Sequence, residues 1–380
     1  MTLCALRGPN FSGRTRRLRE WVGLPPETCV DPAFDQTAYI GPAAAANLSG
    51  VAPSVAAEFE LMAVDGESAV ASKRALEDLG FGYCLAQNPF TLSGGEQVVV
   101  AVLAALAGRP KRLAVDCAFE QLSPSTRTDV MRYLSTADVD LMIADNRLDE
   151  WHRGPAECLE ATPGAPVMKP QAHLTVACEP CQIEVLDLCH TYVKGRPILH
   201  KLNMKFEAGG NYLLTGPNGS GKSTLSKILC GIIRPTSGEI RLNGRPVKPW
   251  RAPGSFVSYA FQDPDLQLFA GRVSAQLENC RRPAAVADWF GLDRHLGEHP
   301  LDLPFVLRKR LALGGALGRE KSLSIVDEPT LGQDADSVAA VRALVSRATT
   351  IVISLAEIYA DLPRLDLQPQ SPNSRRFVPN

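Results

Sequence analysis

The sequence repeats itself, and this internal repeat constrains the fold more than any other feature. The segment GPNFSGRT at residues 8–15 returns as GPNGSGKS at residues 216–223. The segment LAVDCAFEQLS at 113–123 returns as SIVDEPTLGQD at 324–334, so each motif recurs after about 210 positions and their order is kept. Such self-similarity predicts two structural units of the same kind in one chain.

Each copy begins like a phosphate-binding domain. An apolar strand, LCAL or YLLT, leads into a glycine-rich loop and then into a stretch with leucine at helical spacing. This pattern predicts the α/β fold of P-loop NTPases, and alternating apolar residues from Ile183 onward predict additional antiparallel strands in the second copy. We place the first domain at 1–153, a Pro-rich linker at 154–182, the second domain at 183–365 and a C-terminal tail at 366–380.

The composition argues against several functional classes. Forty basic and 41 acidic residues give a formal net charge of -1, so no global positive field attracts nucleic acid and no nucleic-acid partner is expected. The sequence has neither a signal-peptide pattern nor a run of about 18 apolar residues, so we expect neither secretion nor a membrane span. Ten scattered cysteines fit a reducing cytoplasm better than a disulfide framework.

The glycine-rich loop of the second copy is predicted to bind the phosphates of ATP. Its glycines let backbone N–H groups wrap around phosphate oxygens, and the positive end of the following helix points at the same anion. Lys222 is predicted to reach the β- and γ-phosphates, and Ser223 to bind Mg²⁺. The predicted ATP contacts of this loop are Gly216, Pro217, Asn218, Gly219, Ser220, Gly221, Lys222, Ser223 and Thr224.

Two acidic residues follow an apolar strand about a hundred residues after this loop. Asp327 ends the strand, where a carboxylate beside the loop can hold the water shell of Mg²⁺. Glu328 would face the attacking water next to the γ-phosphate, so we predict that it acts as the general base. The alternative interpretation is an exposed acidic turn after a core strand.

The first copy contains the hexapeptide LSGGEQ at residues 92–97. This is the signature sequence of ABC ATPases, and the chain resembles that family over nearly its whole length. The resemblance implies a RecA-like core with a helical subdomain in each domain, and a head-to-tail pseudo-dimer with ATP between the loop of one domain and the signature of the other. Bare backbone amides and a hydroxyl at a helix start form a second anion cradle, here Ser93, Gly94, Gly95 and Glu96.

The resemblance implies roles for residues outside these motifs. Tyr192 matches the aromatic that stacks on adenine, although an aromatic in a strand also fits core packing. Gln262 matches the glutamine that senses Mg²⁺ and water, and Asp334 matches the acid of the loop after the second metal strand. The implied catalytic residues are Glu328, Gln262 and Lys222. The implied Mg²⁺ ligands are Ser223, Gln262 and Asp327.

The two copies lack complementary parts of the ATP site. In the first copy the changed positions are Arg14 for the lysine, Cys117 for the base, Pro42 for the glutamine and Ser123 for the following acid. The planar fork of arginine does not replace a compact ammonium in a tight loop. In the second copy LPFVL at 303–307 occupies the signature position and offers neither hydroxyl nor glycine. These losses predict one competent composite site and one degenerate site.

The switch histidine of the family is absent from both copies. Leu355 occupies its place after the strand TIVIS, and Asp145 is the predicted counterpart after LMIA. In the family this histidine donates a hydrogen bond to the γ-phosphate, and a charge-assisted bond contributes about 1.5–3 kcal/mol. We therefore expect ATP hydrolysis to be slow or to require a partner protein.

The segment FQDPDLQLF at 261–269 resembles the ATPases of energy-coupling-factor transporters. The resemblance implies a peripheral subunit on the cytoplasmic face of the cell membrane, working with a transmembrane coupling protein and a substrate-binding membrane protein. Leu266, Leu268 and Phe269 would then be exposed contacts for the membrane partner. The alternative is a Pro-Asp turn whose leucines pack inward.

The sequence also allows functions other than transport. A non-transport ABC ATPase that acts on ribosomes or DNA is disfavoured because the linker is short, Pro-rich and not strongly basic. An ATP-gated scaffold with little turnover fits Leu355 and the degenerate site. Cys178 and Cys181 form a CxxC that allows a structural zinc site, with reduced free thiols as the alternative.

Overall fold

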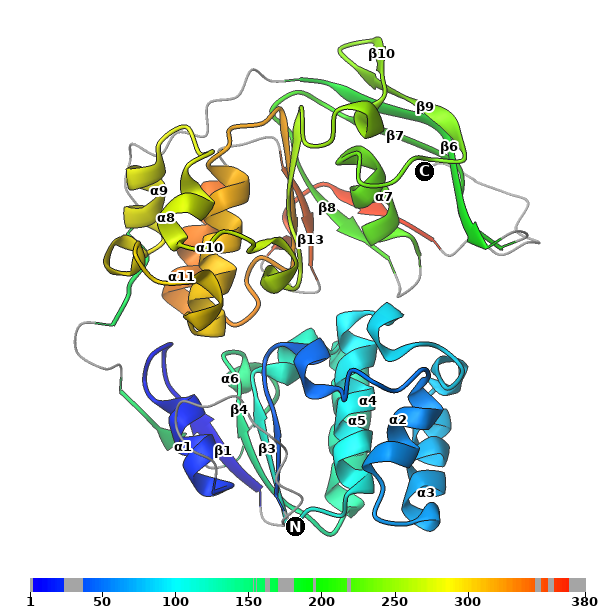
Figure 1. The fold of residues 1–380 in the computed structure, drawn as a ribbon, viewed down its shortest axis with the longest axis vertical. Coiled ribbons are helices and arrows are strands. Elements are labelled where there is room, and N and C mark those ends of the chain that lie inside the picture. Colours follow the sequence, from blue (N-terminus) through cyan, green and yellow to red (C-terminus); the bar gives the residue numbers. More distant parts are fainter. Residues whose placement is uncertain are drawn as a thin grey trace. The chain divides into compact units, whose positions relative to one another are not determined.

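The computed structural model describes residues 3–23, 37–152, 154, 156–160, 165–169, 181–193, 196–216, 220–345, 350–354 and 359–368. Contacts divide the chain into two compact units (Figure 1). The first unit is Met1–Pro166 with Leu331–Ala335, and the second is Val167–Thr330 with Asp336–Asn380. The division at Pro166 falls within the segment 154–182 that the sequence predicts as a linker.

The first unit is built on a parallel sheet of five strands in the order β2-β3-β4-β1-β5. The strands are β1 (Leu3–Arg7), β2 (Thr37–Ile40), β3 (Arg112–Asp116), β4 (Asp140–Ala144) and β5 (Glu157–Cys158). The helices are α1 (Arg14–Trp21), α2 (Val55–Met62), α3 (Gly66–Asp78), α4 (Gly94–Ala107), α5 (Pro124–Thr136) and α6 (Leu148–Trp151), with short 3₁₀ turns η1 (Ala44–Asn47), η2 (Gly82–Cys84), η3 (Pro89–Thr91) and η4 (Ala118–Gln121).

Side chains at the helix starts explain where several of these helices begin. Ser54, Asp65 and Ser123 immediately precede α2, α3 and α5, and each accepts a hydrogen bond from a backbone N–H of the first turn. Such caps satisfy backbone donors that have no partner within the helix. Helices α2, α3 and α4 pack on one another and form the helical part of the unit (Figure 1).

The second unit contains two sheets. One is parallel with the order β11-β12-β13-β8-β14, and the other is antiparallel with the order β10-β9-β6-β7. The strands are β6 (Ile183–Val193), β7 (Arg196–Phe206), β8 (Asn211–Thr215), β9 (Ser237–Leu242), β10 (Arg245–Val247), β11 (Val257–Ala260), β12 (Leu323–Asp327), β13 (Thr350–Ile353) and β14 (Arg364–Asp366). The helices are α7 (Lys222–Leu229), α8 (Val273–Leu277), α9 (Pro283–Trp289), α10 (Phe305–Leu317) and α11 (Ala335–Val345), with 3₁₀ turns η5 (Pro249–Arg251), η6 (Pro264–Gln267), η7 (Asp293–His295) and η8 (Pro300–Asp302).

The two parallel sheets have the same topology, which is the structural form of the sequence repeat. In chain order the five strands of the first sheet correspond one by one to those of the second, and the order across the sheet is identical. Residues with positive φ recur at matching places, namely Gly8 with Gly216, Gly13 with Gly221, Cys117 with Glu328 and Arg109 with Glu320. The predicted pair of α/β domains is therefore confirmed.

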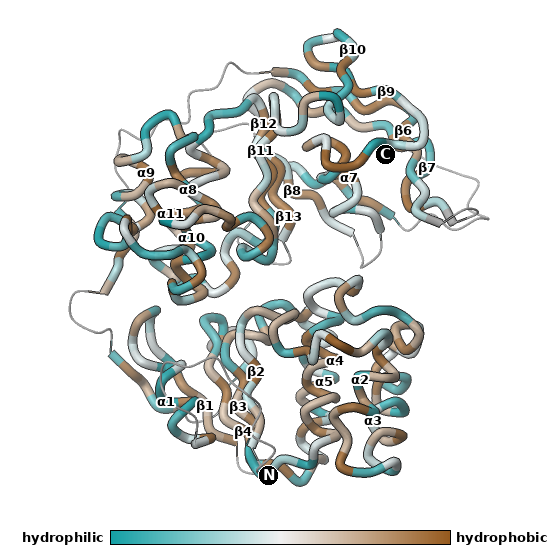
Figure 2. The backbone as a smooth tube through the Cα atoms, viewed as in Figure 1, coloured by the Kyte–Doolittle hydropathy of each residue, from teal (hydrophilic) through white to brown (hydrophobic). Residues whose placement is uncertain are grey.

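Most residues of the core strands are apolar and buried, as expected for a parallel sheet that is covered on both faces. All five residues of β12 are buried, and so are the last four of β3. In Figure 2 apolar residues predominate along both strands. Within the described residues, no helix is long and apolar enough to cross a membrane.

Candidate functional site

The phosphate-binding loop of the second unit joins β8 to α7. Gly216 adopts a φ of +142° and Gly221 a φ of +99°, backbone conformations that residues with a Cβ rarely adopt. A Cβ on Gly216 would lie 2.2 Å from the carbonyl oxygen of Leu367. A Cβ on Gly221 would lie 2.6 Å from Cδ2 of Leu199. The backbone of this loop therefore requires glycine at both positions.

The polar side chains around the loop differ in their burial and in their hydrogen bonds. Nζ of Lys222 donates a 2.7 Å hydrogen bond to the carbonyl oxygen of Gly216, so the ammonium folds back onto the loop. Ser220 is buried and its hydroxyl has no hydrogen-bond partner among the described residues, whereas Ser223 is exposed at the start of α7. Thr224 is buried next to it. The predicted ATP contacts Pro217, Asn218 and Gly219 lie outside the described residues.

The two predicted acidic residues lie at the carboxyl end of β12. Asp327 is buried and accepts a 3.0 Å hydrogen bond from the hydroxyl of Tyr259. Burial raises the pKa of Asp327, while the positive charge of Lys309 acts in the opposite direction. Glu328 has a φ of +43°, and its carboxylate accepts a 2.8 Å hydrogen bond from the hydroxyl of Ser354. Asp327 thus ends, and Glu328 directly follows, a central strand whose neighbour β13 also pairs with β8, the strand that precedes the phosphate loop.

Gln262 lies two residues beyond the end of β11, next to the acids in the fold. Its carbonyl oxygen accepts a 2.8 Å hydrogen bond from Nζ of Lys309, a residue of α10 that is 0% exposed. The same ammonium also donates to the carbonyl oxygen of Asp327 at 2.9 Å. Burial lowers the pKa of Lys309 to about 8 against the opposing effect of the nearby carboxylates. The structure therefore brings the loop of Gln262 and the end of β12 together.

Tyr192 stands on β6 with 57% of its surface exposed, so its ring is not part of the core. Its hydroxyl lies 3.4 Å from the hydroxyl of Thr224, the residue that ends the predicted ATP contacts of the loop. The imidazole of His190 packs against the ring edge-on, with centroids 4.6 Å apart. One face of an aromatic ring is thereby held near α7, where a planar base could stack on it.

These residues fit ATP and Mg²⁺ by their chemistry. A phosphate chain would supply acceptors for the loop N–H groups, for the Lys222 ammonium and for the buried Ser220 hydroxyl that lacks a partner. Mg²⁺ prefers oxygen ligands, and Ser223, Asp327 and the amide of Gln262 offer them. A bound cation would also supply positive charge beside the buried carboxylate of Asp327.

The signature sequence of the first unit forms the start of helix α4. The backbone N–H and the hydroxyl of Ser93 each donate a 2.7 Å hydrogen bond to the carboxylate of Glu96, which in turn accepts one from the hydroxyl of Tyr83. A Cβ on Gly95 would lie 2.9 Å from the carbonyl oxygen of Gln121. The glycine therefore lets the helix start approach η4 closely, and Glu96 orients the serine.

The corresponding helix start in the second unit is apolar. Leu92 and Leu303 each follow a 3₁₀ turn directly and precede the cap position, which is Ser93 in α4 and Pro304 in α10. Pro304 has no side-chain acceptor, and the next residue, Phe305, is a buried aromatic. This helix start presents no hydroxyl to an anion.

The first unit keeps the backbone of a phosphate loop but fills it with its own side chains. Gly8 and Gly13 have φ of +151° and +85°, close to those of their counterparts. Arg14 is buried, and its guanidinium donates to the side-chain oxygens of Asn10 at 3.2 Å and Asn146 at 2.5 Å. The amide of Asn146 donates in turn to Glu120 at 2.9 Å. The arginine is thus engaged by acceptors from its own domain.

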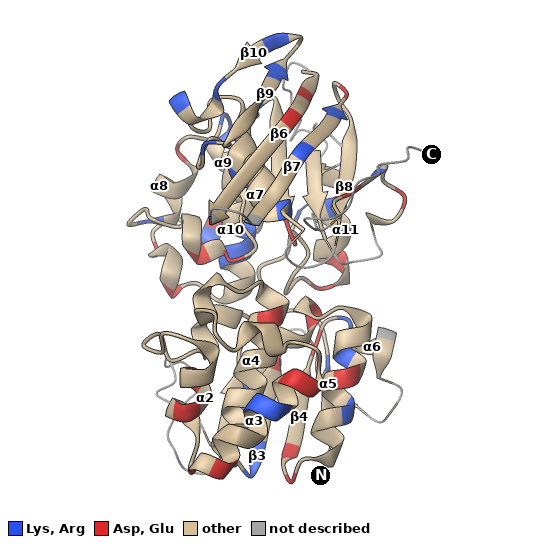
Figure 3. Ribbon diagram, turned by 90° about the vertical axis from the view of Figure 1, so that its right-hand side faces the viewer, with Lys and Arg blue, Asp and Glu red and all other residues tan. Residues whose placement is uncertain are grey.

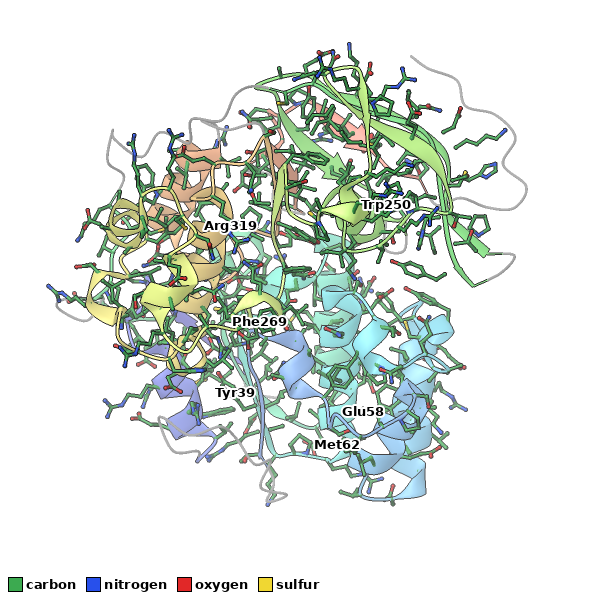
Figure 4. The ribbon with its side chains drawn as sticks, turned by 45° about the horizontal axis from the view of Figure 1, so that its top comes forward. Tyr39, Glu58, Met62, Trp250, Phe269 and Arg319 are labelled. Carbon is green, nitrogen blue, oxygen red and sulfur yellow. The ribbon has the colours of Figure 1, made fainter. Side chains whose placement is uncertain are left out.

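In the first unit, the counterparts of the predicted Mg²⁺ ligands Ser223 and Asp327 are hydrogen-bonded directly to each other. Thr15, which corresponds to Ser223, donates its hydroxyl to Asp116 at 2.5 Å. Tyr39, labelled in Figure 4, donates to the same carboxylate at 2.8 Å, as its counterpart Tyr259 does to Asp327. Cys117 adopts a φ of +53° at the position of Glu328, so the turn survives although the carboxylate is lost.

The strand register corrects one prediction about the switch position. Asp116 pairs with Ala144, and Asp327 pairs with Ile353. The residue after each partner is Asp145 in the first unit and Ser354 in the second, so Asp145 corresponds to Ser354. We predicted that Asp145 matches Leu355, which is wrong by one position. Leu355 itself lies outside the described residues.

Asp145 makes the stability of the first unit depend on pH. Burial, followed by the charge of Glu120, raises the pKa of Asp145 to about 8, whereas an unfolded aspartate titrates near pH 3.9. Between these values the folded state keeps a proton that the unfolded state releases. Stability therefore falls as pH rises towards 8, by up to about 1.4 kcal/mol per pH unit from this group, and levels off above it.

We expect Asp145→Asn to flatten this dependence. The free energy of unfolding, measured by urea denaturation at pH 5, 6.5 and 8, should show a smaller loss in the variant than in the wild type. Asp138→Asn is the matched control because Asp138 is exposed in the same unit and should leave the slope unchanged. Parallel profiles for wild type and Asp145→Asn would contradict a buried protonated carboxyl.

The segment at 261–269 only partly has the predicted exposure. Leu266 is exposed, and Phe269, labelled in Figure 4, is 84% exposed. Leu268 is 3% exposed, so the expectation that it forms part of an apolar surface is wrong. Leu266 lies within the turn η6, which Asp263 caps, and Leu268 follows directly after this turn.

No group of three or more His, Cys, Asp or Glu residues that could hold a metal ion occurs among the described residues. Cys181 is buried, and Cys178 lies outside the described residues. The zinc hypothesis for the CxxC therefore stays untested for one of its two thiols.

The sequence analysis did not predict several residues outside the motifs that hydrogen-bond to the residues of the site. Lys309 and Tyr259 contact the acids, and Tyr83 contacts the signature, but none of them belongs to a motif. One signal could have found Tyr259. It is the third residue of β11, as Tyr39 is of β2, so the repeat itself marks both tyrosines.

Comparisons with known proteins agree with this geometry. Residues 199–331 match the family model described as ABC transporter. The energy-coupling factor transporter ATP-binding protein EcfA of Methanocaldococcus jannaschii is 31% identical over 204 residues, which cover 47% of this chain and 73% of that protein. The chain belongs to the ABC transporter ATP-binding protein family. An uncharacterized family member from Mycobacterium tuberculosis strain H37Rv is 30% identical over 294 residues, covering 70% of this chain and 41% of its own length.

Solved structures of similar fold extend over both units. The RNase-L Inhibitor structure has a TM-score of 0.60 and covers 98% of this chain and 86% of that one, at 16% identity. A model titled ribosome-bound archaeal Pelota and ABCE1 has a TM-score of 0.65 and covers 93% and 69%, also at 16% identity. These likenesses concern the fold and agree with two ABC domains in one chain.

Family membership implies ATP binding by the chain. The chain spans about two fifths of the length of this mycobacterial relative. The activity, substrate and partners of a whole transporter are therefore matters for proposal.

Proposed function

We propose that the chain is the ATP-hydrolysing subunit of a membrane transporter, of the energy-coupling-factor type, with one competent ATP site. In the ATP-bound state the phosphate loop of the second domain works with the signature of the first, as in a head-to-tail pair. ATP favours this closed state because only closure adds the signature contacts, and that difference in affinity is available to move a partner. The other pair of motifs forms the degenerate site.

The observation that carries this proposal is the complementary state of the two domains. The second domain has a glycine-dependent loop with Lys222, and Asp327 and Glu328 behind it. The first domain has the serine-capped signature helix, while its own loop is filled by Arg14. The second domain has an apolar, proline-capped helix start at the signature position. The phosphate loop with its acids is therefore intact only in the second domain, and the signature helix is intact only in the first.

The residues have distinct roles in the proposed reaction. The loop and Lys222 hold the β- and γ-phosphates, and Tyr192 stacks on the adenine. Ser223, Asp327 and Gln262 would hold Mg²⁺, which supplies charge neutralisation at the phosphates. Glu328 orients the attacking water and accepts its proton. Ser93 and the amides of the signature helix contact the γ-phosphate from the other domain.

The membrane partner is proposed from the exposed apolar residues of the second domain. Leu266 and Phe269 lie on the loop after Gln262, so a partner that binds them would be connected directly to the ATP site. Acidic and basic residues both occur along the elements of each unit in Figure 3, which fits a protein partner better than a nucleic acid. We place the chain on the cytoplasmic face of the cell membrane together with the transmembrane and substrate-binding components.

The composite site is tested by one substitution at each signature position. Ser93→Arg should abolish ATP turnover, because a bulky cation replaces a hydroxyl at the helix start that meets the phosphate. Pro304→Arg changes the matched, exposed cap of α10 and should leave at least about half of the turnover. Turnover is measured by phosphate release, for the chain alone and with the membrane proteins that co-purify with it. Equal losses in both variants would contradict a single composite site, and ATP binding without turnover even with the partner would favour a nucleotide-gated scaffold.

A further inference from the structure

Lys309 is a buried cation inside the second unit that no sequence motif accounts for. It lies on α10 with 0% of its surface exposed. Its Nζ donates three hydrogen bonds, to the carbonyl oxygens of Phe261 at 3.0 Å, Gln262 at 2.8 Å and Asp327 at 2.9 Å. An ammonium has three donors, so this side chain is fully used. Removing it would leave three backbone acceptors of the site without their donor.

These three carbonyls lie where two neighbouring strands stop pairing. Strands β11 and β12 are parallel partners, and their last pair is Ala260 with Val326. Phe261 and Asp327 come directly after that pair, where the ladder no longer supplies N–H donors across the gap. Lys309 joins the two chains at this point. It therefore fixes the spacing between the loop of Gln262 and the end of β12.

A comparison between the domains indicates that this is more than general packing. Counting from the leucines that precede the two signature helices, Lys309 corresponds to Val98, which is also 0% exposed. The first domain folds the same sheet with an apolar residue there. A buried ammonium is unfavourable unless it is fully paired, so the fold itself does not require one. The lysine occurs in the domain that keeps Gln262, Asp327 and Glu328.

We propose that Lys309 is a positioning residue of the ATP site, which holds the loop of Gln262 at a fixed distance from Asp327 and Glu328. This inference rests on the proposed function of the same site. The backbone of Gln262 is held on one side and that of Asp327 on the other, so the two proposed Mg²⁺ ligands keep a constant separation. Glu328 follows directly and is aligned by the same contact. The phosphate loop and Tyr192 are not held by Lys309.

The test separates Mg²⁺-dependent steps from nucleotide binding as such. Lys309→Met keeps the length of the side chain and removes its donors. We expect kcat for ATP hydrolysis to fall about 10- to 100-fold because misplaced reacting groups cost that much. ATP affinity in EDTA, measured by titration with a fluorescent ATP analogue, should stay within about threefold of wild type. The gain in affinity on adding Mg²⁺ should shrink.

Two further variants control for stability. Leu311→Ala removes an equally buried side chain two residues along α10, on another face of the helix, and should lower the melting temperature without a selective loss of kcat or of the Mg²⁺ effect. Lys309→Gln keeps a shorter donor, so its kcat and its gain in ATP affinity on adding Mg²⁺ should lie between those of the wild type and Lys309→Met. If Lys309→Met does not fold, Lys309→Gln tests the positioning role in its place. All measurements are made well below the melting temperature of each variant.

The outcomes distinguish this inference from the proposed function. A wild-type chain that binds no ATP overturns the proposed function itself. The wild type binds and hydrolyses ATP in a second outcome, and the folded Lys309 variants have the same kcat and the same gain in ATP affinity on adding Mg²⁺. This result overturns only the positioning role of Lys309. Losses of affinity that are equal with and without Mg²⁺ also overturn it, because they indicate general damage to the site.

Discussion

Replacing Glu328 with glutamine is expected to lower ATP turnover by about 10²- to 10⁴-fold while ATP still binds. Glu328 begins the turn after β12 in a left-handed conformation, and Ser354 fixes its carboxylate by a 2.8 Å hydrogen bond. Glutamine keeps the shape and the acceptor for Ser354 but cannot take a proton from water. Turnover is measured by phosphate release, and binding by titration with a fluorescent ATP analogue.

The internal repeat provides a matched control for this substitution. Cys117 occupies the same turn in the first unit, with a φ of +53° and a backbone hydrogen bond from its N–H to Ala144 that mirrors the one from Glu328 to Ile353. Cys117→Ser should therefore change turnover by no more than about twofold. Normal turnover in Glu328→Gln, or an equal loss in Cys117→Ser, would show that the acid of β12 is not the base of a single working site.

The repeat allowed much of the fold to be predicted, because backbone requirements leave a trace in local sequence. Gly216 and Gly221 need positive φ, and Gly8 and Gly13 need it at the same places, so the loop could be located twice. Apolar strands that end in acids likewise placed β3 and β12. The order of the strands across each sheet was not predicted, because strands that pair, such as β1 and β4, lie far apart in the sequence.

Contacts between distant residues could not be predicted in this way. Lys309 and Gln262 are 47 positions apart and meet only because α10 packs against β11 and η6. A lysine in a helix is ordinarily solvated, so the sequence offers no sign that this one is buried. Leu268 was misjudged for a related reason, since a single turn at η6 decides which of two neighbouring apolar residues points inward. The one-residue error at Asp145 came from counting after a strand whose register was unknown.

The filled loop of the first unit explains how a degenerate motif keeps its fold. The glycines preserve the backbone, but Arg14 now satisfies Asn10 and Asn146, and Thr15 satisfies Asp116. Several polar groups that would otherwise face phosphate and metal are thus paired within the domain, although Nδ2 of Asn10 and one guanidinium nitrogen of Arg14 are buried without a hydrogen-bond partner among the described residues. Under the proposal of a single competent site, exchanging Arg14 for lysine alone should not create nucleotide binding there, because Asn10 and Asn146 remain.

Replacing Lys222 with alanine is expected to weaken ATP binding by about 10- to 150-fold, the equivalent of one charge-assisted hydrogen bond to phosphate. The ammonium lies on the loop at 2.7 Å from the carbonyl oxygen of Gly216, ready to move to the phosphates, and no other described residue of the loop carries a positive side chain. Titration of the chain with a fluorescent ATP analogue measures the change.

The controls are Arg14→Lys and Arg14→Ala, which alter the corresponding residue of the first unit. Both should leave the ATP affinity within about twofold even if they lower stability, because the guanidinium of Arg14 already donates its hydrogen bonds to Asn10 and Asn146. The wild type should bind one ATP per chain with high affinity. A second high-affinity ATP that is lost in the Arg14 variants would contradict the assignment of a single competent site and indicate that the arginine loop binds nucleotide as well.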